Sequence, residues 1–311
     1  MNPKKIALGL TILTFVFTLV SCKKEKDVQT VPTITAQVVA AANLSILESA
    51  VIKANLASTL EGTGPFTVFA PTDEAFTASG ITAATINSLT AAQLQSILLY
   101  HVIPSKIIAA NVPAGPNAKV VTASGDSVFV TKNASGVFIN GINVTQADID
   151  ASNGVIHLVS KVIMPPTGNI VEVAQSNANF SFLVAAVVRA STGSTNVAQI
   201  LSSGGPFTLF APTNEAFIAA GFANIAAINA ADPNTLAAIL TYHVISGRVF
   251  SSGLTNGSSV TTANGGSVTI ALSGSAASVK GKTNASASNI ILTNLMARNG
   301  VIHVIDRVLL P

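Results

Sequence analysis

Apolar side chains recur at helical spacing in two stretches of the chain that have the same register. Leu94, Ile97, Leu98 and His101 follow a capping box that runs from Thr90 to Gln93. The second stretch has Asp232 as the cap, Pro233 at the first helical position, and then Leu236, Ile239, Leu240 and His243. Each stretch therefore predicts a helix whose histidine lies on the face toward the core.

Other segments predict further helices and one short strand in each half of the chain. Asn43 to Leu60 and Phe182 to Arg189 carry apolar residues at helical spacing. Phe66 to Phe69 is a short apolar run that Pro71 must stop, because proline has no N–H to donate. A helix is expected to restart at once: Thr72 caps it ahead of Asp73 and Glu74, and Thr213 and Glu215 repeat the arrangement.

From Lys119 onward the pattern changes to the alternation of apolar and polar residues that is typical of strands. Three runs are expected to be strands: Val128–Val130, Val137–Ile139 and Val155–Met164. Hairpin signals separate them at Ser124-Gly125, Ser135-Gly136 and Asn153-Gly154. Separate runs of helices and strands predict the α+β class, with helices packed on a β-sheet body.

The chain contains one domain twice. Gly64 to Phe76 recurs as Gly205 to Phe217, an offset of 141, and Tyr100-His101-Val102-Ile103 recurs as Tyr242-His243-Val244-Ile245. Asn153 to His157 returns as Asn299 to His303. A period above 140 residues indicates a duplicated domain rather than a solenoid unit. We expect domains at 33–165 and 169–311, joined at Pro165-Pro166-Thr167-Gly168, where tandem prolines end the last strand.

The N-terminus predicts export and lipid attachment. Lys4 and Lys5 precede a 15-residue apolar run, Ile6 to Val20, that is shorter than the about 20 residues a spanning helix needs. Leu19-Val20-Ser21-Cys22 resembles the lipobox of bacterial lipoproteins, and Cys22 is the only cysteine. We expect a signal peptide at 1–21, lipid on Cys22 as the membrane anchor, and a tether at 22–32. Ordinary secretion is the alternative.

The charge of the chain and its expected location limit the kinds of partner that it can bind. Removal of the signal would leave 16 − 2 = 14 basic side chains against 13 acidic ones, which argues against nucleic acid because phosphate binding needs clustered Lys and Arg. Lys23, rather than aspartate, follows Cys22. By analogy with other bacterial envelopes, this favours the outer membrane, on either its periplasmic or its surface-exposed side.

The three repeated motifs together resemble the fasciclin-like domain family. The match occurs twice and covers about Thr33 to Pro165 and Asn169 to Pro311. The resemblance implies a wedge-shaped β-sandwich with a helical cluster, and a secreted or anchored module that mediates adhesion without known chemistry. It also implies a candidate interaction motif, because a Tyr-His pair and an Asp-Ile pair serve integrin binding in animal members.

The motif is complete only in the first copy. Its residues there are Tyr100, His101, Asp148 and Ile149, whereas the second copy keeps Tyr242 and His243 but has Asn294-Leu295 in place of Asp-Ile. Neither copy contains Arg-Gly-Asp. Integrin recognition is therefore not supported, and only the broader role of an interaction module transfers.

The four histidines are paired by the repeat and admit structural and catalytic interpretations. His101 and His243 lie on apolar helix faces, and His157 and His303 alternate with valines on strands, which favours buried, hydrogen-bonded imidazoles. No histidine or cysteine pair has metal-ligand spacing, and no Gly-x-Ser-x-Gly elbow occurs. Asp148 to Gly154 lacks the bidentate Glu of a calcium loop. We expect no catalytic residue, metal or cofactor.

Three functions stay open from the sequence. The first is a lipid-anchored cell-envelope adhesion or interaction module that binds a protein or polysaccharide. The second is a small-ligand-binding or hydrolytic domain that uses His101 and His243, and the third is a structural spacer. Asp126-Ser127-Val128 also resembles a bacterial O-glycosylation site, so Ser127 is a candidate for modification.

Overall fold

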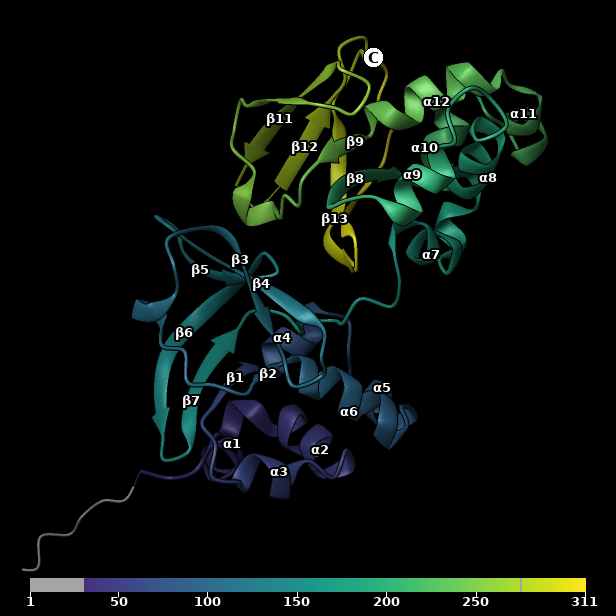
Figure 1. Cartoon of the computed structure of the whole chain (residues 1–311). Coiled ribbons are helices and arrows are strands. Elements are labelled where there is room, and N and C mark those ends of the chain that lie inside the picture. Colours follow the sequence, from purple (N-terminus) through teal and green to yellow (C-terminus); the bar gives the residue numbers. More distant parts are fainter. Residues whose placement is uncertain (1–30, 275) are drawn as a thin grey trace, which may run out of the picture. The chain divides into compact units, whose positions relative to one another are not determined.

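A computed structural model describes residues 31–274 and 276–311 of the chain. Two domains with the same element order follow one another, with a helical group and a sheet in each (Figure 1). The predicted signal peptide, Cys22 and Lys23 lie outside the described residues. Their assignments stay predictions.

The first domain has six α-helices and seven strands. Its helices are α1 (Ile34–Ala40), α2 (Ser45–Lys53), α3 (Ala57–Glu61), α4 (Asp73–Ala78), α5 (Ala83–Ser88) and α6 (Ala91–Tyr100), with 3-10 turns η1 (Ala42–Leu44) and η2 (Ala109–Asn111). Its strands are β1 (Phe66–Pro71), β2 (Val102–Ile103), β3 (Gly115–Val121), β4 (Ser127–Asn133), β5 (Gly136–Ile139), β6 (Ile142–Ala151) and β7 (Gly154–Val159).

The second domain repeats this order. Its helices are α7 (Ile170–Gln175), α8 (Ser181–Ala190), α9 (Val197–Ser203), α10 (Asn214–Ala219), α11 (Ile225–Ala230) and α12 (Pro233–Tyr242), with η3 (Ala178–Phe180) and η4 (Ser251–Gly253). Its described strands are β8 (Phe207–Pro212), β9 (Val244–Ser246), β10 (Ser259–Thr261), β11 (Ser267–Ser273), β12 (Ala276–Lys280), β13 (Ser288–Ala297) and β14 (Gly300–Ile305).

Each sheet has seven strands, and only one neighbouring pair in each is parallel. The first sheet has the order β2-β1-β7-β6-β5-β4-β3, and the second has β9-β8-β14-β13-β12-β11-β10. The parallel pairs are β1 with β7 and β8 with β14, so the first and last strands of each domain lie side by side. This pairing needs a long crossover, which the helices and the remaining strands supply.

Strand β1 is buried on both faces, and β8 has the same burial pattern in the second domain. In β1, Val68 and Ala70 pack with the helices, while Phe69 packs against Val128 and Ile139 of β4 and β5. The two halves of the sheet therefore face each other as a sandwich, and the predicted α+β class is confirmed. Burial on both sides also explains why β1 does not alternate between apolar and polar residues. Its one polar residue, Thr67, is buried and donates to the carbonyl oxygen of Ser105 at 2.6 Å.

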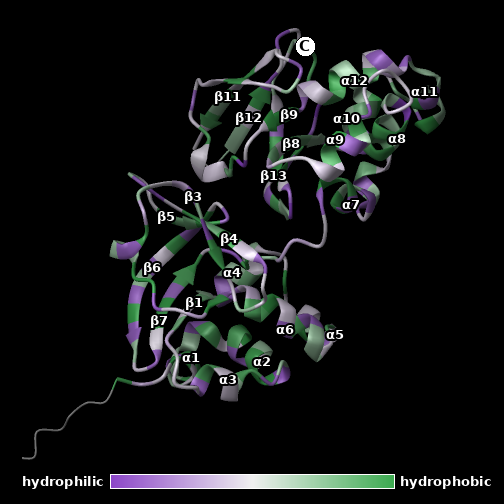
Figure 2. Cartoon of the chain, viewed as in Figure 1, coloured by the Kyte–Doolittle hydropathy of each residue, from purple (hydrophilic) through white to green (hydrophobic). Residues whose placement is uncertain are grey.

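The helices have one buried and one exposed face, and green and purple residues accordingly lie next to each other along them in Figure 2. Their predicted starts are confirmed: Thr72, Thr90 and Asp232 accept backbone N–H groups as N-caps. Among the described residues no single helix has the length and apolarity to cross a membrane. One bent pair, Ile34–Ala40 with Ala42–Lys53, satisfies the length and composition criteria only jointly, across a 100° bend.

Two predicted elements are shorter than expected. The helix expected over Asn43 to Leu60 is broken, because Asn55 takes a left-handed conformation (φ 56°) between α2 and α3. The strand expected over Val155 to Met164 ends at Val159. Beyond it, the N–H groups of Val162 and Ile163 bond to Ser79 Oγ and His101 Nε2 instead of to a neighbouring strand.

Candidate functional site

The Tyr-His pair of each domain lies at the C-terminal end of a helix and points inward. His101 and His243 are the C-cap residues of α6 and α12, with 2% and 0% of their surface exposed. Tyr100 and Tyr242 are both 0% exposed. All four side chains are therefore interior groups, which need hydrogen-bond partners inside the protein.

The imidazoles of His101 and His243 connect a helix to the segment that ends the domain. His101 lies 2.9 Å, through Nδ1, from the carbonyl oxygen of Ile97, and its Nε2 accepts the N–H of Ile163 at 2.9 Å. In the second domain the same bonds join His243 to the carbonyl oxygen of Ile239 and to the N–H of Leu309, each at 2.8 Å. A backbone N–H can only donate and a carbonyl oxygen can only accept. Both rings are therefore neutral and carry their proton on Nδ1.

His157 and His303 use their nitrogens in the opposite order. Nδ1 of His157 accepts the N–H of Asp148 at 3.1 Å, and Nε2–H donates to the carbonyl oxygen of Ile107 at 2.8 Å. His303 repeats this with the N–H of Asn294 at 3.4 Å and the carbonyl oxygen of Val249 at 2.9 Å. These two rings carry their proton on Nε2. The structural interpretation of the four histidines is confirmed.

Burial sets the charge of these groups. Loss of hydration lowers the pKa of His101, His243 and His303 to about 4, so that all three stay neutral at pH 7. Burial likewise raises the pKa of the Tyr100 phenol to about 12. These groups are held in the protonation states that their hydrogen bonds require, and none is poised to exchange a proton near neutral pH.

Each tyrosine hydroxyl is tied to the sheet. Tyr100 donates to the carbonyl oxygen of Ser127 at 3.0 Å and accepts from Asn140 Nδ2 at 3.0 Å. Tyr242 donates to the carbonyl oxygen of Ser267 and accepts the N–H of Lys282 at 2.9 Å. The pair therefore fastens the end of each helix to two separate parts of its domain.

Asp148 is the exposed member of the predicted interaction motif, and it also has a structural role. Its backbone is left-handed (φ 61°), and its carboxylate accepts the N–H of Ala109 at 2.8 Å, while 43% of the side chain stays exposed. Asn294 has the same conformation and accepts the N–H of Ser251 at 2.8 Å. Ile149 is half-buried and packs on the helical cluster.

The placement of these residues revises the interaction motif. Tyr100, His101, Tyr242 and His243 cannot touch a partner while their domain is folded, because their side chains are buried. Only Asp148 and Ile149 reach the surface. Ser127, the candidate glycosylation residue, is half-buried at the start of β4, and whether it is modified stays a prediction.

Three asparagines that the sequence analysis treated only as turn residues, or passed over, hold the interior together. Asn153 accepts the N–H of Ile34 and donates to the carbonyl oxygens of Leu60 and Gly62, and Asn299 makes the corresponding three bonds in the second domain. Asn140 precedes Gly141 in a turn where both φ angles are positive, 48° and 74°. The Asn140-Gly141 dipeptide is itself a hairpin signal and could have predicted this turn.

A catalytic or metal site finds little support in this geometry. No group of three or more His, Cys, Asp or Glu side chains that could hold a metal occurs among residues 31–274 and 276–311. The cavity beside His101 has a volume of about 20 Å³, and its other lining residues are apolar. An imidazole with both nitrogens bonded to the backbone has none left for a substrate.

Both halves of the chain match a known domain family. The model of the Fasciclin domain matches residues 42–165 and 178–311. The transforming growth factor-beta-induced protein ig-h3 of Sus scrofa is 29% identical over 256 residues, which cover 81% of this chain and 35% of that protein. The Synechocystis protein sll1483 is 44% identical over 134 residues, 41% of this chain and 72% of that protein.

A solved structure of a FAS1 domain pair from the insect cell adhesion molecule Fasciclin I also matches. It has 18% sequence identity and a TM-score of 0.42, and it covers 89% of this chain and 96% of its own. The chain spans about a third of the length of the ig-h3 relatives. With both halves matched by one family model, the chain belongs to the Fasciclin domain family, as two tandem copies.

Proposed function

We propose that this chain is an exported, lipid-anchored module of the bacterial cell envelope that mediates adhesion by binding a protein or polysaccharide. The observation that carries the proposal is that the Fasciclin domain model matches both halves of the chain; the family resemblance implies secreted or anchored modules that mediate adhesion. Lipid on Cys22 would hold the module at the outer membrane. Nucleic acid is not a partner under this proposal.

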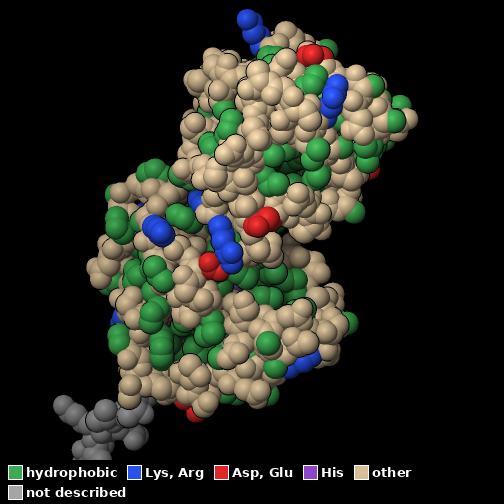
Figure 3. Space-filling model, turned by 45° about the vertical axis from the view of Figure 1, so that its right-hand side comes forward, with side chains coloured by type: hydrophobic (Ala, Val, Ile, Leu, Met, Phe, Trp, Pro, Cys, Tyr) green, Lys and Arg blue, Asp and Glu red, His purple; other side chains and the backbone are tan. Residues whose placement is uncertain are grey.

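The surface supports recognition through hydrogen bonds rather than charge. Only 9% of the residues are charged, and Figure 3 shows a face on which uncharged polar surface predominates, with apolar side chains scattered through it and few charges. The buried histidine and tyrosine side chains already use their hydrogen-bonding groups inside the protein. Binding should therefore depend on exposed loops and edge strands, such as β3 and β10, and should change little with salt.

A cell-adhesion assay tests the proposal. Cells that produce the full chain should adhere to or aggregate with a protein or polysaccharide surface more than cells that lack it, at both low and high salt. Protease treatment of intact cells would show whether the domains face outward. A folded chain that binds no cell, protein or polysaccharide would contradict the adhesion role and favour the structural spacer.

The anchor is tested separately with Cys22→Ser. Metabolic labelling with an alkyne fatty acid should mark the wild-type chain and leave the variant unmarked. The variant should also move from the membrane fraction to the soluble fraction, because the acyl chains supply the membrane affinity. Equal labelling of the two chains would contradict lipid attachment at Cys22.

A further inference from the structure

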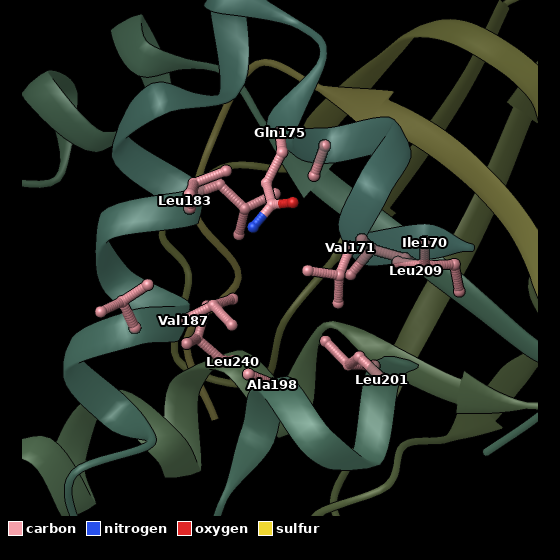
Figure 4. Close-up of a pocket in the computed structure, with 12 residues that line it drawn as sticks. Ile170, Val171, Gln175, Leu183, Val187, Ala198, Leu201, Leu209 and Leu240 are labelled. Atoms are coloured by element: carbon pink, nitrogen blue, oxygen red, sulfur yellow. The ribbon is translucent and has the colours of Figure 1, made fainter. Parts of the chain in front are cut away.

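The helical group of the second domain contains a cavity of about 60 Å³ between α7, α8, α9 and α12 (Figure 4). Its floor is formed by buried residues such as Leu183, Leu201 and Leu240. Gln175 is the only residue of the lining with a polar side chain, and its amide points toward the space between α7 and α8.

The first domain fills the corresponding space. Ala174 stands where the first domain has Val38, 136 residues earlier, and Val197 stands where it has Leu56. Val38 and Leu56 are both buried, and the cavity that they line has a volume of only about 20 Å³. Ala174, which lines the larger cavity, has two carbon atoms fewer than Val38, and this smaller side chain leaves space at that position.

The residues at the mouth of the cavity also differ between the two domains, and the second domain lacks a hydrogen bond and a charge that the first domain has there. In the first domain the Thr35 hydroxyl donates to the carbonyl oxygen of Ala57 at 3.4 Å and joins α1 to α3. The second domain has Val171 at that position, which cannot make the bond, and both Val171 and Ala198 line the cavity. Val184 replaces Glu48, so the rim is apolar where the first domain carries a charge.

Shape and lining together define the ligand. A cavity of about 60 Å³ is less than half of the roughly 150 Å³ that accommodates benzene in an engineered apolar cavity. A benzene ring is therefore too large for this space, whereas the last carbons of an unbranched chain are small enough to enter it. We propose that this pocket binds the terminal carbons of a single alkyl chain, with the polar head of the amphiphile outside the mouth beside Gln175. The proposal is independent of the adhesion role.

Methyl NMR of the exported full chain with Cys22→Ser tests the proposal, since that change removes any lipid of the chain's own. The probes are octanoate and dihexanoylphosphatidylcholine, each below its critical micelle concentration, with benzene as the wide probe. The alkyl probes should shift the methyl signals of Val171, Leu183 and Leu240 and leave those of Val38 and Leu47 unchanged. Preference for octanoate or for the phospholipid would identify the source of the chain.

Ala174→Val introduces the residue of the first domain and should weaken alkyl binding about tenfold or more, because the space for the chain is filled. Ala226→Val, the same change at an exposed position of α11, is the matched control and should bind as the Cys22→Ser chain does. If Ala174→Val does not fold, Val171→Thr closes the mouth instead and should weaken binding severalfold. Absence of binding, equal shifts in both domains, or binding that Ala174→Val leaves unchanged would overturn the proposal.

Discussion

The two domains are a comparison built into one chain, and they agree most closely where side chains bond to the backbone. The four histidines and the paired asparagines Asn153 and Asn299 make the same bonds in each copy. The copies differ where a side chain only fills space, as at Val38 and Ala174, and at Asp148 and Asn294 the residue changes while the bond to a backbone N–H is kept. The comparison teaches that the motif residues close the interior, while size and surface vary around them.

The largest expected effect comes from removing a histidine of the Tyr-His pair. His101→Leu leaves the N–H of Ile163 and the carbonyl of Ile97 without that partner, and each buried unsatisfied group costs about 1–3 kcal/mol. We expect a loss of about 4 kcal/mol in the free energy of unfolding of the first domain, and the same in the second domain for His243→Leu.

The two tyrosines make this measurement specific to each domain. The chain has two tyrosines, one buried in each domain, so labelled tyrosine rings give one NMR signal per domain during denaturant unfolding. His101→Leu should move only the Tyr100 transition, and His243→Leu only that of Tyr242. A loss below about 1 kcal/mol in either variant would contradict the structural role of that ring.

A smaller effect per residue is expected when the pH is lowered. An unfolded histidine takes up a proton below a pKa of about 6.5, whereas His101, His243 and His303 resist protonation until about pH 4. The unfolded state therefore binds more protons between these values, and stability falls as the pH falls. From pH 7 to pH 5 each such histidine should cost about 2 kcal/mol.

His101 brings this loss to the first domain, and His243 and His303 bring it to the second. Both the Tyr100 transition and the Tyr242 transition should therefore lose stability on acidification. The measurement is denaturant unfolding at pH 7 and at pH 5, again followed through the two ring signals. Unchanged or increased stability of either domain at pH 5 would contradict the burial argument.

The smallest effect is expected where the copies already differ. Asp148→Asn gives the first domain the residue of the second, and its oxygen can still accept the N–H of Ala109. The change in the free energy of unfolding should stay below about 1 kcal/mol. Asp148→Ala is the sharper test, because it removes that bond and places a non-polar residue at a positive φ, and it should cost more than Asp148→Asn.

The sequence predicted what local patterns encode and missed what distant contacts decide. The caps at Thr72, Thr90 and Asp232 and the inward face of His101 follow from spacing alone. The parallel pairing of β1 with β7 does not, because it joins residues 88 apart, such as Phe66 and Gly154. The partners of the histidines are backbone groups, which no residue type reveals.

The sequence also predicted one part of the candidate site and missed another. The doubled motifs identified the family and both Tyr-His pairs. The family resemblance, however, assigned an interaction role to these tyrosine and histidine side chains, and the fold buries them. The pocket at Ala174 depends on a difference of two methyl groups from Val38. That difference has meaning only once the two positions are known to occupy the same place in each domain.

Long-range ¹H–¹⁵N NMR of the histidine rings at pH 7 tests the central claim most directly, because it reads which ring nitrogen carries the proton. Four neutral rings are predicted, with the proton on Nδ1 in His101 and His243 and on Nε2 in His157 and His303. A proton on Nε2 of His101 or His243, or a ring of either that gains charge near pH 6.5, would contradict the account.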